Sequence, residues 1–155
     1  MAESYSDQIW QIACDTFETI CYMFPLDKDE ANTLSDNLAD MSDIRSAITF
    51  EGATKGMMVI RPSYDLLDAI AANMLGVDEP SSEEKEGALC EIANIICGNT
   101  VPLFANGERI CYLNPPRLLT DLNASEVNSQ TGKKESINVF LDEGVAEISI
   151  YYFTK

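Results

Sequence analysis

The sequence of 155 residues contains no histidine. This absence excludes histidine as a general base, as the partner of a catalytic nucleophile and as a metal ligand. Cysteine is present five times, but an odd number without Cys-x-x-Cys spacing fits neither a disulfide framework nor a zinc site. The sequence therefore indicates no metal-binding cluster on this chain.

The cysteines instead follow helical spacing. Cys14 and Cys21 are seven residues apart, as are Cys90 and Cys97, and seven residues make two helical turns. Each pair therefore shares one face of its helix. We expect buried thiols in a reducing compartment rather than reactive ones.

Basic residues are also scarce. Lys and Arg number 10 against 26 Asp and Glu, which gives a formal net charge of −16 at pH 7. This balance argues against nucleic acid as a partner, because phosphate binding needs clusters of Lys and Arg. A solvated acidic surface is the simplest explanation of the charge, and a protein partner with a basic face is the alternative.

Long apolar runs are missing as well. No run reaches the ~18 apolar residues that a membrane span needs, and the opening segment MAESYSDQIW lacks the basic stretch of a signal peptide. We therefore expect a cytoplasmic protein that does not enter a membrane. A chain of this length buries roughly 70% of its unfolded surface, and we expect residues 1–155 to form a single domain.

Apolar residues at helical spacing predict three helices. Ser63 and Gly76 have the residue types that begin and end the second helix. Ser81 and Glu84 form a capping-box pattern at the start of the third helix, and Pro102 either kinks that helix or ends it early. The first predicted helix ends before Pro25. The second covers residues 64–75, and the third covers residues 83–105.

Five segments have the composition of β-strands, and their order gives the fold class. RSAITFEG and MMVIRP form a hairpin across the turn ATKG, and SINVFL and VAEISIYYF form a second one across Asp142-Glu143-Gly144. RICYL is a strand between the hairpins that ends at Asn114-Pro115-Pro116. Helices and strands do not alternate as βαβ units do, so we expect an α+β fold with helices packed on an antiparallel or mixed sheet.

The third helix has an uneven distribution of side chains around its axis. At about 100° per residue, Glu91 and Asn94 lie opposite a broad apolar stripe, with Gly87 and Gly98 between them. Glycine inside a helix costs about 0.5–1 kcal/mol relative to alanine. Such a bare face suits insertion into a concave partner, although a solvated face is the commoner explanation of the spacing alone. The apolar stripe consists of Leu89, Ile92, Ala93, Ile96 and Cys97.

One sequence pattern connects this helix with a proline that lies well beyond its end. EIAN, which contains Glu91 and Asn94, is followed after 21 residues by Pro116 in LNPPRL. The pattern Glu-x-x-Asn-x21-Pro resembles the signature of the CheC/CheX/FliY family of chemotaxis phosphatases, and the CheX branch is the nearest match. FEGATKGMMVIRPSYDLLDAIAANMLG and ESINVFLDEGVAEISIYYF also resemble the segments that surround this signature in CheX-like proteins. The resemblance covers about residues 5–153 and implies the CheC-like fold.

The resemblance implies a protein phosphatase that hydrolyses the aspartyl phosphate of a CheY-type response regulator in two-component signalling. It implies that Asn94 orients the attacking water and that Glu91 pairs with a lysine of the regulator. Mg²⁺ is expected in the regulator, and no cofactor is expected on this chain. Gly87 and Gly98 are expected at the partner contact, and Pro116 is interpreted as structural, shaping the turn after its strand. A homodimer is also implied.

Two features of the sequence leave alternatives open. The family usually has Asp or Ser four residues before the Glu, where this chain has Gly87. A regulator-binding module without catalysis is therefore the alternative function, and a structural part of the flagellar switch is a further one. CDTFETIC resembles CEIANIIC, but overlaying Glu18 on Glu91 places Cys21 where Asn94 stands. A thiol does not replace a carboxamide, so we expect one active face per chain.

Overall fold

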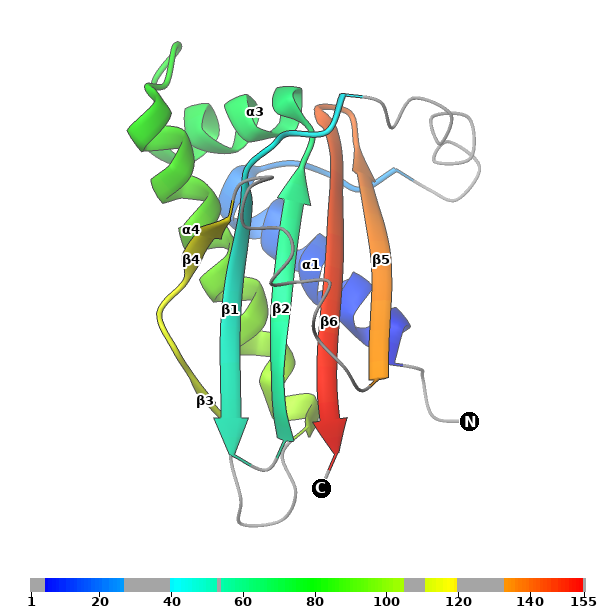
Figure 1. Cartoon of the computed structure of the whole chain (residues 1–155). Coiled ribbons are helices and arrows are strands. Elements are labelled where there is room, and N and C mark those ends of the chain that lie inside the picture. The colour runs from blue at the N-terminus through cyan, green and yellow to red at the C-terminus, as the bar shows by residue number, and fades with distance from the viewer. Residues whose placement is uncertain (1–4, 27–39, 53, 105–110, 120–132, 155) are drawn as a thin grey trace.

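The computed structural model describes residues 5–26, 40–52, 54–104, 111–119 and 133–154. These residues form one antiparallel sheet with three helices on one of its faces, the α+β architecture predicted above (Figure 1). The helices are α1 (Tyr5–Cys21), α3 (Tyr64–Leu75) and α4 (Ser82–Thr100), followed by the 3-10 helix η2 (Val101–Phe104). The strands are β1 (Arg45–Gly52), β2 (Thr54–Pro62), β3 (Cys111–Leu113), β4 (Arg117–Leu119), β5 (Lys133–Leu141) and β6 (Gly144–Thr154).

The sheet has the strand order β3-β1-β2-β6-β5, and β4 also pairs with β1. β6 therefore lies in the interior of the sheet, and β5 forms one edge. The other edge is discontinuous, because β3 pairs with one end of β1 and β4 pairs with the other end. Asn114-Pro115-Pro116 connects the two short strands. Proline lacks the N–H that a continuous strand would donate to its neighbour, which explains the interruption.

The core lies between the sheet and the helices. Successive strand residues point to opposite faces, so β2 directs Met58 and Ile60 toward the helices and Met57 and Val59 toward the open face. Burying a side chain of this size contributes about 1.5–3 kcal/mol. The core layer therefore fixes each helix on the sheet. Its largest fully buried side chains include Phe17, Phe50, Met23, Ile48, Leu89 and Ile92.

Both predicted cap pairs are present. Ser63 Oγ accepts a hydrogen bond from the backbone N–H of Leu66 at 3.3 Å, and Gly76 ends α3 in the left-handed conformation with a φ of 68°. Ser81 Oγ accepts from the backbone N–H of Glu84 at 3.2 Å, while Glu84 Oε1 accepts from the backbone N–H of Ser81 at 2.9 Å. This capping box fixes where α4 begins, and hence which of its residues face outward.

Several element boundaries differ from the predicted ones. The turn ATKG was predicted too long, because β2 already begins at Thr54. α4 ends at Thr100 and continues as η2, since Pro102 has no N–H to extend the helical hydrogen bonds. β5 begins at Lys133, earlier than predicted, and β4 was not predicted at all. The predicted end of the third helix, residue 105, lies outside the described residues.

Helix α1 ends before Pro25, as a result of its own backbone. Tyr22 has a φ of 57°, and this left-handed conformation stops a helix as a C-terminal glycine does. The backbone N–H of Met23 then donates to the carbonyl of Phe17 at 3.1 Å. The chain turns back toward the sheet, where Pro25 forms an isolated bridge with Leu141 of β5.

The stretch Ser82–Phe104 is long and apolar enough, by length and composition, to cross a membrane. Half of the 18-residue window that meets this criterion is buried inside the molecule. Its apolar side faces the sheet and α1, as in the core helix of a globular domain.

Candidate active face of helix α4

Helix α4 carries the predicted site residues and is fixed by its neighbours. It packs against α1, α3 and β1, and Leu89, Ile92 and Ile96 on its inner side are 0% exposed. Lys85 Nζ lies 2.7 Å from Asp68 Oδ1, which joins the first turn of α4 to α3. An exposed pair of this kind contributes at most about 1 kcal/mol. The apolar packing therefore sets the rotation of α4 and determines which face is outward.

Glu91 and Asn94 are both exposed on that outward face. They are one helical turn apart, so their side chains are neighbours. Within the part of the chain that the structure describes, neither side chain has a hydrogen-bond or ion-pair partner. A carboxylate offers two acceptor oxygens, and a carboxamide offers both donors and an acceptor. The pair can therefore bind a cation and a water molecule side by side.

The two glycines of the outward face have different surroundings. A Cβ on Gly87 would have no neighbouring heavy atom within 4 Å, whereas a Cβ on Gly98 would lie 3.7 Å from Cδ1 of Leu113 in β3. Gly87 is exposed and Gly98 is half-buried. The fold does not require glycine at position 87, and the bare surface one turn before Glu91 is accessible to a partner.

Two contacts show how the discontinuous sheet edge runs along α4. Cys90, Asn94 and Gly98 are four residues apart and form one row on the helix. Cys90 Sγ lies 3.7 Å from Ser46 Oγ of β1, at the position that pairs with β4. At the other end of the row, Gly98 faces Leu113 of β3. Because Asn94 lies midway along this row, we infer from the two contacts that it is level with the connection between β3 and β4.

Pro116 belongs to that connection. The backbone N–H of Asn114 donates to the carbonyl of Thr49 at 2.9 Å, and Asn114 Nδ2 donates to Thr49 Oγ1 at 2.8 Å. These bonds hold the start of the connection, and the two prolines keep it from pairing further. Sequence reasoning placed Pro116 in a turn but did not find the strand that follows it. Only a strand signal in RLL would have indicated that the β3–β4 edge of the sheet lies beside α4.

Helix α1 does not repeat the arrangement of α4. Glu18 is exposed, but Cys21 is 0% exposed, so the position that matches Asn94 points into the core. The outer face of α1 is also partly bonded within itself, because Gln11 Nε2 donates to Asp15 Oδ1 at 2.9 Å. Glu18 therefore has no exposed carboxamide one turn away.

Burial controls the reactivity of the thiols. All five cysteines are free, and Cys14, Cys21 and Cys97 are buried as predicted, whereas Cys90 and Cys111 are half-buried. Desolvation raises the pKa of Cys14, Cys21 and Cys97 to about 12, so these thiols are protonated near neutral pH and are poor nucleophiles. No three His, Cys, Asp or Glu side chains among the described residues are grouped so that they could hold a metal ion.

Solved structures of chemotaxis proteins have this fold. The chemotaxis protein CheX of Vibrio vulnificus is 19% identical over 97% of each chain, with a TM-score of 0.73. A CheC-like superfamily protein from Shewanella sp. PV-4 is 22% identical over 99% of each chain, with a TM-score of 0.72. A Borrelia burgdorferi structure, a CheX–CheY complex with BeF3 and Mg²⁺, is 14% identical over 96% of this chain and 97% of that one, with a TM-score of 0.70. These likenesses define the class of the fold, that of the CheC-like chemotaxis proteins.

A match to a sequence model of one family narrows this class further. The family model described as chemotaxis phosphatase CheX matches residues 44–141, which include α4 and the connection at Pro116. The chain belongs to this CheX family. No curated protein sequence matches the chain significantly.

Proposed function

We propose that this protein hydrolyses the aspartyl phosphate of a CheY-type response regulator by inserting the outward face of α4 into the regulator's active site. One observation carries the proposal: Glu91 and Asn94 are exposed one turn apart, without partners among the described residues, in a chain of the CheX family. The CheX–CheY complex of B. burgdorferi supports a regulator of the CheY type as the partner. We place the reaction in the cytoplasm.

In the proposed reaction Asn94 positions water. The carboxamide holds a water molecule in line with the phosphorus–oxygen bond of the phosphoaspartate. Attack by water on phosphorus breaks that bond, inorganic phosphate leaves, and the aspartate carboxylate is regenerated. An amide suits this position because it binds water without presenting a negative charge to the phosphoryl group. Positioning and charge stabilisation account for most of the catalysis in phosphoryl transfer.

Glu91 has a different role in the proposal. Its carboxylate pairs with a lysine of the regulator's active site and sets the position of α4 along the regulator. A charge-assisted hydrogen bond of this kind becomes stronger once the interface excludes water. The regulator supplies Mg²⁺, which neutralises charge on the phosphoryl oxygens, and this chain is expected to bind no cofactor.

The remaining predicted residues surround this pair. We assign Gly87 and Gly98 to the surface that meets the regulator, with Gly87 as the barer of the two positions. We assign Pro116 a positioning role, because the connection that contains it is level with Asn94. If the edge strand were not interrupted at Pro116, it would present additional backbone N–H groups along this edge of the sheet.

We also propose a homodimer, on the basis of the family resemblance. The outer side of β5 supports it, because β5 is an edge strand of nine residues. On this outer edge, a backbone hydrogen bond among the described residues lies near the end of the strand, where the N–H of Leu26 donates to the carbonyl of Phe140 at 2.8 Å. Light scattering on the purified protein tests this point, and a monomer mass at micromolar concentration would refute it.

The lifetime of a phosphorylated receiver protein tests the main proposal. The receivers encoded in the same genome are phosphorylated, and loss of phosphate is followed with wild type, Glu91→Ala and Asn94→Ala. Wild type is expected to shorten the lifetime of at least one receiver, and each variant is expected to lose most of this effect. The proposal fails if no receiver decays faster with wild type.

A regulator-binding module without hydrolysis is the second candidate, and Gly87 favours it. The family pattern has Asp or Ser at this position, so the chain lacks one polar side chain next to Glu91. This candidate predicts binding that prefers the phosphorylated receiver and leaves its lifetime unchanged. The same assay, with a binding measurement beside it, separates the two functions.

A further inference from the structure

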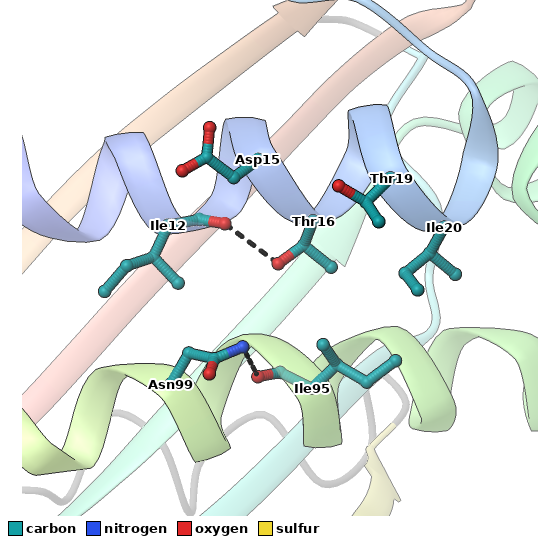
Figure 2. Close-up of a pocket in the computed structure, with 7 residues that line it drawn as sticks. All are labelled: Ile12, Asp15, Thr16, Thr19, Ile20, Ile95 and Asn99. Atoms are coloured by element: carbon teal, nitrogen blue, oxygen red, sulfur yellow. Dashed lines mark hydrogen bonds between the residues drawn. The ribbon is translucent and has the colours of Figure 1, made fainter.

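A groove of about 530 Å³ runs between α1 and α4 and begins beside the candidate active face (Figure 2). Ile95, one turn after Glu91, lines its α4 side, and Ile12 and Ile20 line its α1 side. All three isoleucines are partly exposed. Figure 2 shows them pointing into the space between the two helices. The groove therefore has an apolar lining that extends the outward face of α4 toward α1.

Two polar side chains of the groove donate hydrogen bonds within their own helices, and the lining keeps unused acceptor atoms, while the hydroxyl of Thr19 also lines the groove. Thr16 Oγ1 donates to the carbonyl of Ile12 at 2.8 Å, and Asn99 Nδ2 donates to the carbonyl of Ile95 at 3.1 Å. Asn99 keeps its Oδ1 as an acceptor, and Asp15 at the α1 rim keeps acceptor positions beyond the bond from Gln11. A ligand that supplies hydrogen-bond donors and apolar surface fits this lining.

The charge around the groove favours a cation. Along α1, α3 and α4 the sequence has Lys85 as its single basic residue, and Lys85 is already paired with Asp68. Acidic side chains are frequent on the same helices, and Asp15 and Glu18 are both exposed on α1. A surface with one sign of charge attracts and orients ligands of the opposite sign.

We propose that this groove binds the side chain of a second basic residue, Lys or Arg, of the response regulator docked on the outward face of α4. The inference rests on the proposed function, and it adds a contact separate from the lysine that Glu91 meets. Ile95 and Asn99 are four residues apart, about 6 Å along the helix axis. The aliphatic stem of a basic side chain spans this length, packing on the isoleucines while its charged end reaches Oδ1 of Asn99, and Asp15 at the α1 rim adds negative charge.

The first test separates binding from chemistry. In the dephosphorylation assay, Asn99→Leu and Asp15→Asn are expected to raise KM about 3- to 10-fold, with kcat within about twofold of wild type. Glu147→Gln is the matched control, because it removes the same charge from an exposed position of β6 on the open face of the sheet. An unchanged KM in both groove variants, or a similar increase in Glu147→Gln, overturns the inference.

The second test identifies the occupant. Each Lys and Arg on the receiver is replaced by Met and combined with Asn99→Leu in double-mutant cycles. One basic residue is expected to couple with Asn99, so that the double variant binds about 3-fold or more tighter than the two single effects predict. Additive effects for every basic residue of the receiver overturn the inference.

A third measurement needs no receiver and keeps the two proposals distinguishable. Nα-acetyl-arginine amide is titrated into the isotope-labelled protein, with Nα-acetyl-norleucine amide as the uncharged control. Saturable shifts at Thr16, Ile95 and Asn99 with the arginine derivative alone support the groove, even if no receiver is dephosphorylated. The absence of saturable shifts overturns it. If Asn94→Ala abolishes dephosphorylation while the groove variants leave KM unchanged, the groove inference fails and the proposed function stands.

Discussion

Helices α1 and α4 have similar sequences in their C-terminal halves but expose different side chains. Each contains two cysteines seven residues apart and packs against the same core. In α1 the exposed side bears acidic residues, and Gln11 and Asp15 are hydrogen-bonded to each other. In α4 the exposed side has Glu91 and Asn94 without partners among the described residues, next to Gly87, where an added Cβ would meet no neighbouring heavy atom within 4 Å. A shared helical spacing therefore preserves packing in both helices while their outward residues differ, and under the proposed function only α4 acts on a partner.

The largest expected effect is the loss of dephosphorylation in Asn94→Ala. We expect the accelerated decay of the phosphorylated receiver to fall about 100-fold or more, because the attacking water loses its positioning group. The exposed site should change the free energy of unfolding by less than about 0.5 kcal/mol. Glu18→Ala on α1 is the matched control and should leave kcat unchanged, because Glu18 is not expected to touch the reacting atoms. Equal losses in both variants would show that α1 is an active helix as well.

The next largest expected effect is on the free energy of unfolding, when the residues at the two matching positions are exchanged. Cys21→Asn places a carboxamide in a fully buried site of α1 and is expected to lower the free energy of unfolding by about 3 kcal/mol. Asn94→Cys, the opposite change on α4, should alter it by less than about 0.5 kcal/mol. Urea unfolding followed by circular dichroism measures both values. A tolerated Asn at position 21 would contradict the inward orientation of this residue and reopen the possibility of a second active face.

Alkaline pH tests the shared packing of the two helices. Burial raises the pKa of Cys14, Cys21 and Cys97 to about 12. The unfolded chain loses these protons near pH 9 while the folded chain keeps them, so the stabilisation is complete below pH 9 and is lost as pH rises toward 12. Each thiol should lower the free energy of unfolding by about 1.4 kcal/mol per pH unit in this window.

The matched experiment removes one thiol from each helix. Cys14→Ala and Cys97→Ala are compared with wild type by denaturant unfolding between pH 8 and about pH 11. This range begins below the ordinary thiol pKa, so it includes the onset of thiol ionisation in the unfolded chain. Each variant should show a shallower decline than wild type, by the slope of one thiol. A decline that is identical in all three proteins would mean that these thiols ionise in the folded state as easily as in the unfolded one.

Local patterns in the sequence predicted the parts of the site that depend on one helix. The capping box at Ser81 and the helical period of 3.6 residues were enough to orient Glu91 and Asn94 outward, because both signals lie within α4 itself. The β3–β4 edge and the α1–α4 groove could not be found in this way. They depend on pairing and packing between segments far apart in the chain, and a three-residue strand such as β4 has too few residues to show alternation.

The smallest expected effect concerns the two glycines of α4. Gly87→Ala and Gly98→Ala should each raise the free energy of unfolding by about 1 kcal/mol or less, since alanine favours the helix and neither Cβ meets a close contact. Neither change supplies a polar group. Gly87→Ser restores the hydroxyl that the family pattern has, and it should speed dephosphorylation about 2- to 5-fold through one added hydrogen bond at the partner contact.

The rates of wild type, Gly87→Ala, Gly87→Ser and Gly98→Ala, measured on the same receiver, distinguish three explanations. If Gly87→Ser accelerates decay while Gly87→Ala does not, the bare position next to Glu91 limits an active phosphatase. If wild type is inactive and Gly87→Ser is active, the chain is a binding module that lost one contact. If both substitutions at position 87 slow the decay and Gly98→Ala does not, the regulator approaches too closely at this position to admit a side chain. In that last case the glycine itself would distinguish α4 from the corresponding helix of its relatives.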